Sequence, residues 1–102
     1  MIAHIIKATD TNFDNLEEVE IPNNKFEAML TIRETIGGYM EFCTCHIENE
    51  PYYILCDDNG KLKGKPVNVL ATSIYDYNGS DTINGDVILL DADTLLDLNN
   101  LF

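Results

Sequence analysis

Residues 39–56 read "YMEFCTCHIENEPYYILC", two runs rich in aromatic and β-branched residues on either side of a short polar link. Runs of this composition are typical of strands, and such a link between them is typical of a β-hairpin. If "ENEP" is the loop, Ile47 faces Tyr52. Counting back along both strands then places Cys43 opposite Cys56. The stretch predicts the central hairpin of an antiparallel sheet.

Two short strands are expected before this hairpin. In "IAHIIKA" at 2–8, Ile2, His4 and Ile6 share one face, and "LEEVEI" at 16–21 alternates apolar and acidic side chains. Alternation of this kind indicates strands that are covered on at least one face. We expect the two segments to form an N-terminal hairpin.

A helix is expected between these strands and the central hairpin, in "NNKFEAMLTIRETIGG" at 23–38. Asn24 stands three residues before Glu27, as in a capping box, and Gly37 is placed to end the helix in a left-handed conformation. The apolar residues recur near helical spacing and are expected to cover one face of the sheet: Phe26, Met29, Leu30 and Ile36.

The C-terminal half adds a turn, a cover segment, a strand and a helix. "DDNG" at 57–60 is a turn signal, and "VNVLATSIY" at 67–75 is expected to form a short helix or an irregular cover. After a polar loop, "DVILL" at 86–90 predicts a buried strand, and Asp93 is placed to cap a last helix. The expected fold class is α+β, a single domain over residues 1–102. It has a small antiparallel sheet of about five strands with a central hairpin, covered by one main helix and short C-terminal helical segments.

The charge of the chain is strongly one-sided. It carries 6 basic and 18 acidic residues, which gives a formal net charge of −12 over 102 residues. A small domain usually has a net charge of magnitude about 2 to 8. Phosphate backbones and anionic membranes repel so acidic a protein, so direct nucleic-acid or membrane binding is not expected. A basic protein surface, including one that holds nucleic acid, would attract it.

Nothing in the sequence indicates secretion. No apolar run approaches the roughly 18 residues of a membrane span, and the N-terminal segment lacks a signal-peptide pattern. The three cysteines, Cys43, Cys45 and Cys56, are an odd number without the density of a disulfide scaffold. We therefore expect free thiols and a cytoplasmic location.

Neither a metal site nor a catalytic base is expected. Cys43 and Cys45 project from one side of a strand and His46 from the other, so the thiols and the imidazole do not converge on a zinc ion. The same geometry separates Cys45 from the base that a nucleophile needs. His4, between two isoleucines, fits a structural role better than a catalytic one. We expect no enzyme activity, no cofactor and no metal.

Acidic residues two apart along a strand carry their charges on one face, about 6.8 Å apart. Such rows can imitate the phosphates of a nucleic acid, or they can serve solubility alone, and both interpretations stay open. The acidic residues expected to contact a partner are Glu18, Glu20, Glu48, Glu50, Asp57 and Asp58.

Half of the basic residues lie in "KLKGK" at 61–65. If this segment is extended, its three lysines lie on one side and would bind an anion such as a nucleotide phosphate, with a tyrosine stacked on the base. The alternative is that the lysines pair with Asp57, Asp58 and nearby carboxylates at a turn. The residues of the ligand-binding interpretation are Lys61, Lys63, Lys65, Tyr39, Tyr52 and Tyr53.

Three segments, "ETIGGYMEF" at 34–42, "CDDNGKLKGKPVN" at 56–68 and "GDVILL" at 85–90, follow one another in the chain. Together they resemble the family catalogued as domain of unknown function 3846. Its members show a helix that ends in a Gly-Gly-Tyr pattern, then a cysteine-bearing Gly-Lys-Leu segment with a proline, and then a Gly-led strand. The family usually has Leu where this chain has Lys65. The matching positions are Gly37, Gly38, Tyr39, Glu41, Cys56, Asp58, Gly60, Lys61, Leu62, Gly64, Pro66, Asn68 and Gly85.

The resemblance implies a small accessory protein of a bacteriophage or other mobile element, with no established reaction. Together with the net charge, it favours a counter-defence protein in the cytoplasm of the host cell. Such a protein would bind a host nuclease or other defence factor, of the restriction or CRISPR type, through an acidic surface that imitates nucleic acid. The alternative is a small protein that sequesters an anionic nucleotide signal through the lysines.

Overall fold

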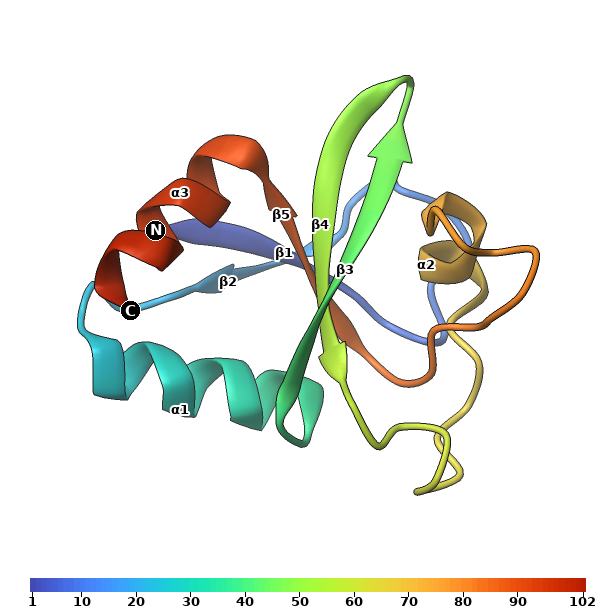
Figure 1. The fold of residues 1–102 in the computed structure, drawn as a ribbon, viewed down its shortest axis with the longest axis horizontal. Helices are drawn as coiled ribbons and strands as arrows, with labels where there is room; N and C mark the ends of the chain where they lie inside the picture. The colour runs from blue at the N-terminus through green and yellow to red at the C-terminus, as the bar shows by residue number, and fades with distance from the viewer.

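A computed structural model describes residues 1–102 and contains one sheet of five strands and three helices (Figure 1). The strands run in the order β2-β1-β5-β4-β3, and every neighbouring pair is antiparallel. The expected α+β fold class is confirmed. The elements are β1 (Ile2–Ile6), β2 (Glu17–Glu20), α1 (Lys25–Ile36), β3 (Met40–Ile47), β4 (Glu50–Asp57), α2 (Val69–Ile74), β5 (Val87–Asp91) and α3 (Ala92–Leu101).

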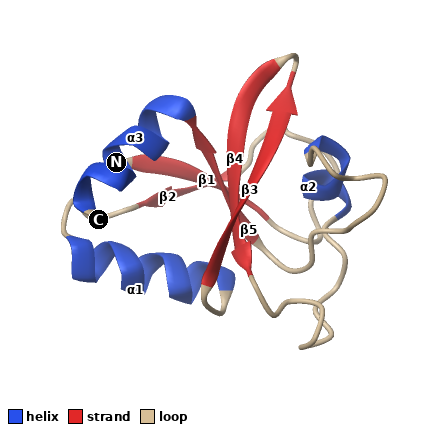
Figure 2. Cartoon of the chain, viewed as in Figure 1, coloured by secondary structure: helices blue, strands red, loops and turns tan.

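The helices cover both faces of the sheet, because side chains alternate between the two faces of each strand. α1 and α3 lie on one side of the strands and α2 lies on the other (Figure 2). The α1/α3 face buries Ala3, Ile21, Ala28, Ile32, Ile36, Leu55, Ile88, Leu90 and Leu98. The α2 face buries Ile6, Cys43, Cys45, Ile54, Cys56, Ala71, Ile83, Val87 and Leu89.

The central hairpin has a tighter turn than expected. Ile47 pairs with Glu50, and the two turn residues, Glu48 and Asn49, have φ angles of 52° and 68°. Two left-handed residues in sequence match the right-handed twist of the flanking strands, so a two-residue turn is favoured over a longer loop. Pro51 therefore lies within β4, near its start, where proline is tolerated.

The predicted register of this hairpin was therefore wrong by two residues. Cys45, and not Ile47, faces Tyr52, and Cys43 lies opposite Ile54. The cause is that Glu50 and Pro51 were assigned to the loop and instead belong to the strand.

α1 begins and ends where the sequence predicts, but the residues that it buries differ. Asn24 accepts a hydrogen bond from the Glu27 backbone N–H, and Gly37 ends the helix with a φ of 76°. The buried residues are Ala28, Ile32 and Ile36, whereas Phe26 is 71% exposed and Leu30 is 41% exposed. The helix face that packs on the sheet has the spacing i, i+4 and i+8. Its first residue, Ala28, is small and allows the helix to pack closely on the sheet.

The C-terminal helix begins earlier than predicted. β5 ends at Asp91 and α3 starts at the next residue, so Asp91 is the N-cap and accepts a hydrogen bond from the Thr94 backbone N–H at 2.7 Å. Asp93 lies in the first turn of the helix. The prediction of Asp93 as the cap was wrong, because strand and helix join without the intervening residues that it assumed.

Candidate functional site

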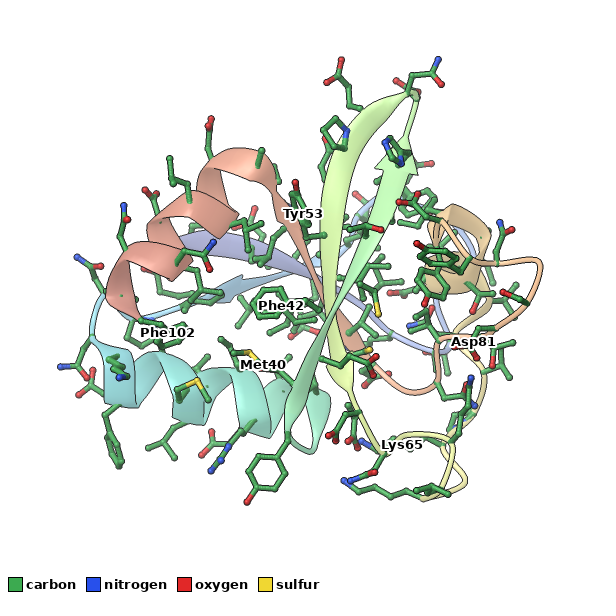
Figure 3. All side chains as sticks on the ribbon, in the orientation of Figure 1. Met40, Phe42, Tyr53, Lys65, Asp81 and Phe102 are labelled. Carbon is green, nitrogen blue, oxygen red and sulfur yellow. The ribbon has the colours of Figure 1, made fainter.

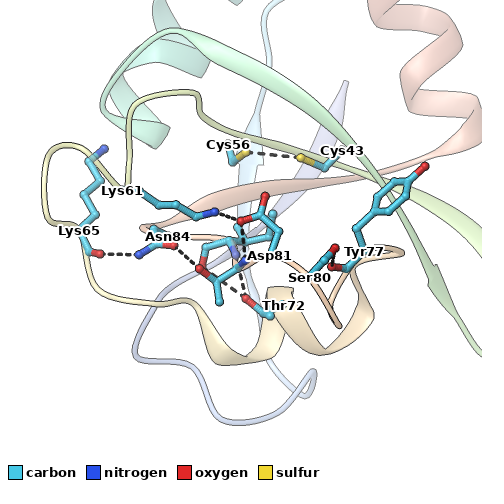
Figure 4. A network of polar contacts seen from close by, with 11 residues as sticks. Cys43, Cys56, Lys61, Lys65, Thr72, Tyr77, Ser80, Asp81 and Asn84 are labelled. Atoms are coloured by element: carbon cyan, nitrogen blue, oxygen red, sulfur yellow. Dashed lines mark hydrogen bonds and ion pairs between the residues drawn. The ribbon is translucent and has the colours of Figure 1, made fainter.

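The lysine segment is folded into turns between β4 and α2, so its three lysines do not line one side. Lys63 and Lys65 converge on one oxygen of Asp57, with Nζ–Oδ2 distances of 2.8 and 2.7 Å. Lys61 pairs instead with Asp81, in the loop before β5 (Figure 4). Each lysine already has a carboxylate partner, and an anionic ligand would have to compete with it.

Asp57 is the centre of this arrangement, and its side chain is only 1% exposed. Burial raises the pKa of the Asp57 carboxyl, but hydrogen bonds from Lys63 and Lys65 outweigh burial and lower that pKa to about 2. The backbone N–H of Asn59 donates to the other carboxylate oxygen at 3.0 Å. Asp57 therefore cannot form part of an exposed acidic surface, and its assignment to the partner-binding residues was wrong.

The same two lysines also cap the C-terminus of α1. Lys65 Nζ donates to the Ile36 carbonyl oxygen at 2.8 Å, and Lys63 Nζ donates to the Gly37 carbonyl oxygen at 3.0 Å. The last carbonyls of a helix lack partners within the helix and carry its negative dipole end, so ammonium groups are favoured there. The segment thus ties the end of α1 to the end of β4.

Two glycines permit this close approach. A Cβ atom at Gly38 would lie 2.4 Å from the Asp57 Oδ1 atom. Gly85 has a φ of 89°, and a Cβ atom there would lie 2.8 Å from the Lys65 Cδ atom. Residues from three separate segments therefore meet around one carboxylate, which we call the Asp57 cluster: Gly37, Gly38, Asp57, Lys63, Lys65 and Gly85.

The segments that meet in the Asp57 cluster are those on which the family resemblance rests. A comparison with protein-family models matches residues 5–99 to the family described as Domain of unknown function (DUF3846). The chain belongs to the DUF3846 family. No curated protein matches the chain, and no solved structure does. In this DUF3846 protein a Cβ atom would lie 2.8 Å or less from another residue at Gly37, Gly38, Gly60 and Gly85, whereas Gly64 has open space and a φ of 71°.

The tyrosines proposed to stack a base do not gather at the lysines of the DUF3846 protein. Tyr52 and Asp57 lie at opposite ends of β4, about 16 Å apart at the usual rise per residue. Tyr53 packs against the α1/α3 core (Figure 3). Tyr39 lies beside the cluster and is exposed, but Arg33 occupies one face of its ring, with the guanidinium carbon 4.3 Å from the ring centroid. The structure does not bring these residues into one ligand site.

The thiols lie in the core under α2. Cys43 and Cys56 place their sulfur atoms 3.7 Å apart (Figure 4), and burial raises the pKa of Cys45 to about 12. His46, on the opposite side of β3, pairs its Nδ1 with Asp76 at 2.7 Å. No group of three or more His, Cys, Asp or Glu side chains lies close enough to hold a metal ion. None of the three helices is long and apolar enough to cross a membrane.

The remaining acidic residues predicted to contact a partner are on the surface. Glu18 and Glu20 lie on β2, which is an edge strand, and Glu48 and Glu50 lie at the tip of the β3–β4 hairpin. This tip projects beyond the rest of the sheet (Figure 1). All four are exposed, as is Asp58. They are distributed over two edges of the sheet and do not form one row.

The largest cavity is a groove of about 570 Å³ on the α2 face, beyond the end that α2 covers, and we call it the sheet groove. Glu18 and Tyr52 are the only residues of the predicted sites that line it. Sequence patterns did not indicate it because its residues come from five strands, the segment between β1 and β2, and α3. They are Ile2, Ala3, His4, Phe13, Asn15, Leu16, Glu18, Ile47, Tyr52, Leu89, Asp91 and Thr94.

Proposed function

We propose that this protein is a non-enzymatic accessory protein of a phage or mobile element that counters host defence. It acts in the host cytoplasm, where it binds a host nucleic-acid-processing protein of the restriction or CRISPR type. Its acidic surface occupies the basic groove that would otherwise hold nucleic acid.

The observation that carries this proposal is how the charges are distributed. Four of the six basic side chains pair with carboxylates of the protein itself, and two of these four share Asp57. The other two, Lys25 and Arg33, lie on α1. The hairpin tip and the sheet groove therefore present carboxylates without a cationic partner, whereas on the edge strand β2 Glu17 pairs with Lys7 and Glu20 with the N-terminal ammonium group. A protein groove that binds phosphates would be attracted to such a surface.

Most of the side chains that would support an enzyme reaction, apart from His4, are engaged in contacts within the protein. The thiols are buried, His46 pairs with Asp76, and Lys63 and Lys65 hold Asp57. The lysine positions equally give no support to nucleotide sequestration, because all three are paired with carboxylates. Binding of a basic partner protein needs only the exposed carboxylates and no free thiol, histidine or lysine.

The test is capture of a nuclease from host lysate by the tagged protein, followed by measurement of the dissociation constant of the purified pair. We expect affinity to fall steeply between about 50 mM and about 200 mM salt, and DNA to compete for the same surface. The captured nuclease should also lose activity in the complex. Salt-independent binding, or a ternary complex with DNA, would contradict the proposal.

A matched pair of variants sharpens this test. Glu48→Gln with Glu50→Gln removes two charges at the projecting hairpin tip, and Glu27→Gln with Glu34→Gln removes two exposed charges from α1. We expect the first pair to weaken binding by roughly tenfold and to reduce its salt dependence. The second pair should change affinity much less. α1 carries Lys25 and Arg33, the two basic side chains without a carboxylate partner, and would not be attracted to a basic groove.

A further inference from the structure

The sheet groove exists because α2 is short. α2 and its neighbouring segments bury the part of this face that contains the cysteines, Ile6 and Val87. The rows of Cys43 and Cys45 continue across the sheet beyond α2: Glu18, His4 and Leu89 lie side by side on β2, β1 and β5, and Asp91 lies beside Tyr52 on β5 and β4. Ile2, at the end of this face, is 49% exposed.

The polar groups of the sheet groove are largely free to bind a ligand. His4, Glu18 and Tyr52 make no side-chain hydrogen bond or ion pair within the protein. Asp91 uses Oδ1 to cap α3 through the Thr94 backbone N–H, and it forms no ion pair. The hydrogen bonds from Thr94 lower the pKa of Asp91, so its carboxylate is charged at neutral pH. A cavity with an apolar floor and several convergent polar groups is the usual form of a binding site.

The charge of the lining selects the ligand. Two carboxylates, Glu18 and Asp91, face the groove, and no lysine or arginine lines it. The lining also includes apolar and aromatic residues, among them Leu89, Phe13 and Tyr52. An arginine side chain matches this combination, because it has an apolar stem and a planar cation that stacks on aromatic rings and pairs with carboxylates in a bidentate manner.

We propose that the sheet groove binds an arginine side chain of a protein partner. The stem lies on Leu89 and Tyr52, and the guanidinium pairs with Glu18 or Asp91. The groove volume of about 570 Å³ also accommodates parts of the residues next to this arginine. The inference rests on the proposed function in one respect: the partner that supplies the arginine is the basic host protein.

The test uses nuclear magnetic resonance of the full-length ¹⁵N-labelled protein and two blocked tripeptides, acetyl-Ala-Arg-Ala-amide and its citrulline analogue. Citrulline has nearly the shape of arginine without the charge. We expect the arginine peptide to give saturable shifts at Ile2, His4, Leu89 and Tyr52, with a dissociation constant of about 1 mM. The citrulline peptide should give none. Equal effects of both peptides, or shifts spread over all surface carboxylates, would overturn the inference.

Variants decide whether the two carboxylates are responsible. Glu18→Gln with Asp91→Asn removes both charges from the groove and keeps the cap of α3, since asparagine caps helices as well as aspartate. We expect at least about fivefold weaker peptide binding, which is about 1 kcal/mol. Glu27→Gln with Glu34→Gln removes the same charge from α1 and should leave peptide binding unchanged. Equal weakening in both pairs would mean that only net charge matters and would overturn the inference.

The same variants separate this inference from the proposed function. If the groove pair still captures the host nuclease with undiminished affinity and salt dependence, the groove is not the docking site, and the proposed function stands. If the unmodified protein captures no basic host protein, the proposed function fails. The peptide titration then still decides whether the groove binds arginine.

Discussion

At the scale of single residues, Asp57 shows how a charge can hold a fold together. Its carboxylate is buried and receives hydrogen bonds from two lysines and a backbone N–H. A buried carboxylate without partners would be strongly destabilising, so the two lysines are needed to keep it in place. The charge that the sequence concentrates at 61–65 is therefore mostly used inside the protein.

The pH dependence of stability should reveal Asp57. Its pKa is about 2 in the folded protein, against an ordinary value of 3.8, so its contribution is complete above about pH 5 and is lost as the pH falls towards 2. The size is about 2 kcal/mol. We expect Asp57→Asn to lower the free energy of unfolding by this amount at neutral pH and to flatten the acid limb. Urea unfolding at several pH values measures both effects.

Asp58→Asn is the control for this prediction. Asp58 is the next residue, carries the same charge, is exposed and has no ion pair. Its replacement should leave the free energy of unfolding within about 0.5 kcal/mol of the unmodified protein. Equal losses in the two variants would show that net charge, and not the Asp57 cluster, is responsible.

Gly38 should tolerate no side chain. Alanine there would place its Cβ 2.4 Å from an Asp57 oxygen that the lysines hold, so either the carboxylate or the backbone must move. We expect Gly38→Ala to cost about 1 to 3 kcal/mol of unfolding free energy in urea titrations. Gly79→Ala is the control, because nothing lies within 4 Å of a Cβ at that position. A stable Gly38→Ala variant would contradict the packing role of this glycine.

At the scale of elements, Asn68 joins α2 to the sheet. Its side-chain oxygen accepts from the Ala71 backbone N–H as the N-cap of α2. Its amide nitrogen donates to the carbonyl oxygens of Ile6, at the end of β1, and of Gly85, before β5, both at 2.9 Å. One buried side chain therefore fixes three segments relative to one another.

Asn68→Ala should destabilise the protein by about 3 kcal/mol, because it removes a cap and leaves two buried carbonyls without donors. Asn24→Ala is the matched control: Asn24 caps α1 with a single bond to Glu27 and is exposed. Its loss should cost about 1 kcal/mol. Thermal or urea unfolding compares the two, and similar losses would contradict the linking role of Asn68.

The boundaries of the elements were more predictable than the faces that they bury. Asn24, Gly37 and the turn glycines act through neighbours a few residues away, so the sequence pattern indicates them directly. The buried face of α1 depends on which stripe the sheet accepts. Phe26 and Leu30 are more hydrophobic than Ala28, yet the close approach of helix and sheet selects the stripe with the smaller residue.

At the scale of the whole molecule, repulsion among unpaired carboxylates opposes folding. The net charge is −12, and only a few carboxylates have cationic partners. Salt screens repulsion between exposed charges, with a screening length of about 10 Å at 0.1 M. We expect the urea midpoint to rise between about 10 mM and about 150 mM sodium chloride with an unchanged slope. A midpoint that falls with salt would show that the ion pairs dominate.

A charge-reversed variant provides the control for the salt experiment. Glu48→Lys with Glu50→Lys changes the net charge by four at the exposed hairpin tip, away from the core. Its midpoint should be higher than that of the unmodified protein at low salt and should rise less on adding salt.

The order of strands and helices, the caps of α1, the acidity and the family were all determined by the amino-acid sequence alone. Each depends on composition or on patterns that span a few residues, as with Asn24 and Gly37. The predicted hairpin register was wrong because the register depends on the left-handed backbone of Glu48 and Asn49. The sequence also allowed a longer loop that includes Glu50 and Pro51.

Only the tertiary structure decided what the lysines and the open face of the sheet do. Lys65 reaches Ile36, 29 residues earlier in the chain, and the sheet groove combines side chains from all five strands. Such contacts depend on distances between segments that no local pattern encodes. These contacts explain why Lys63 and Lys65, which resemble part of an anion site in the sequence, instead pair with the buried Asp57. They also explain why the acidic sheet groove lies elsewhere.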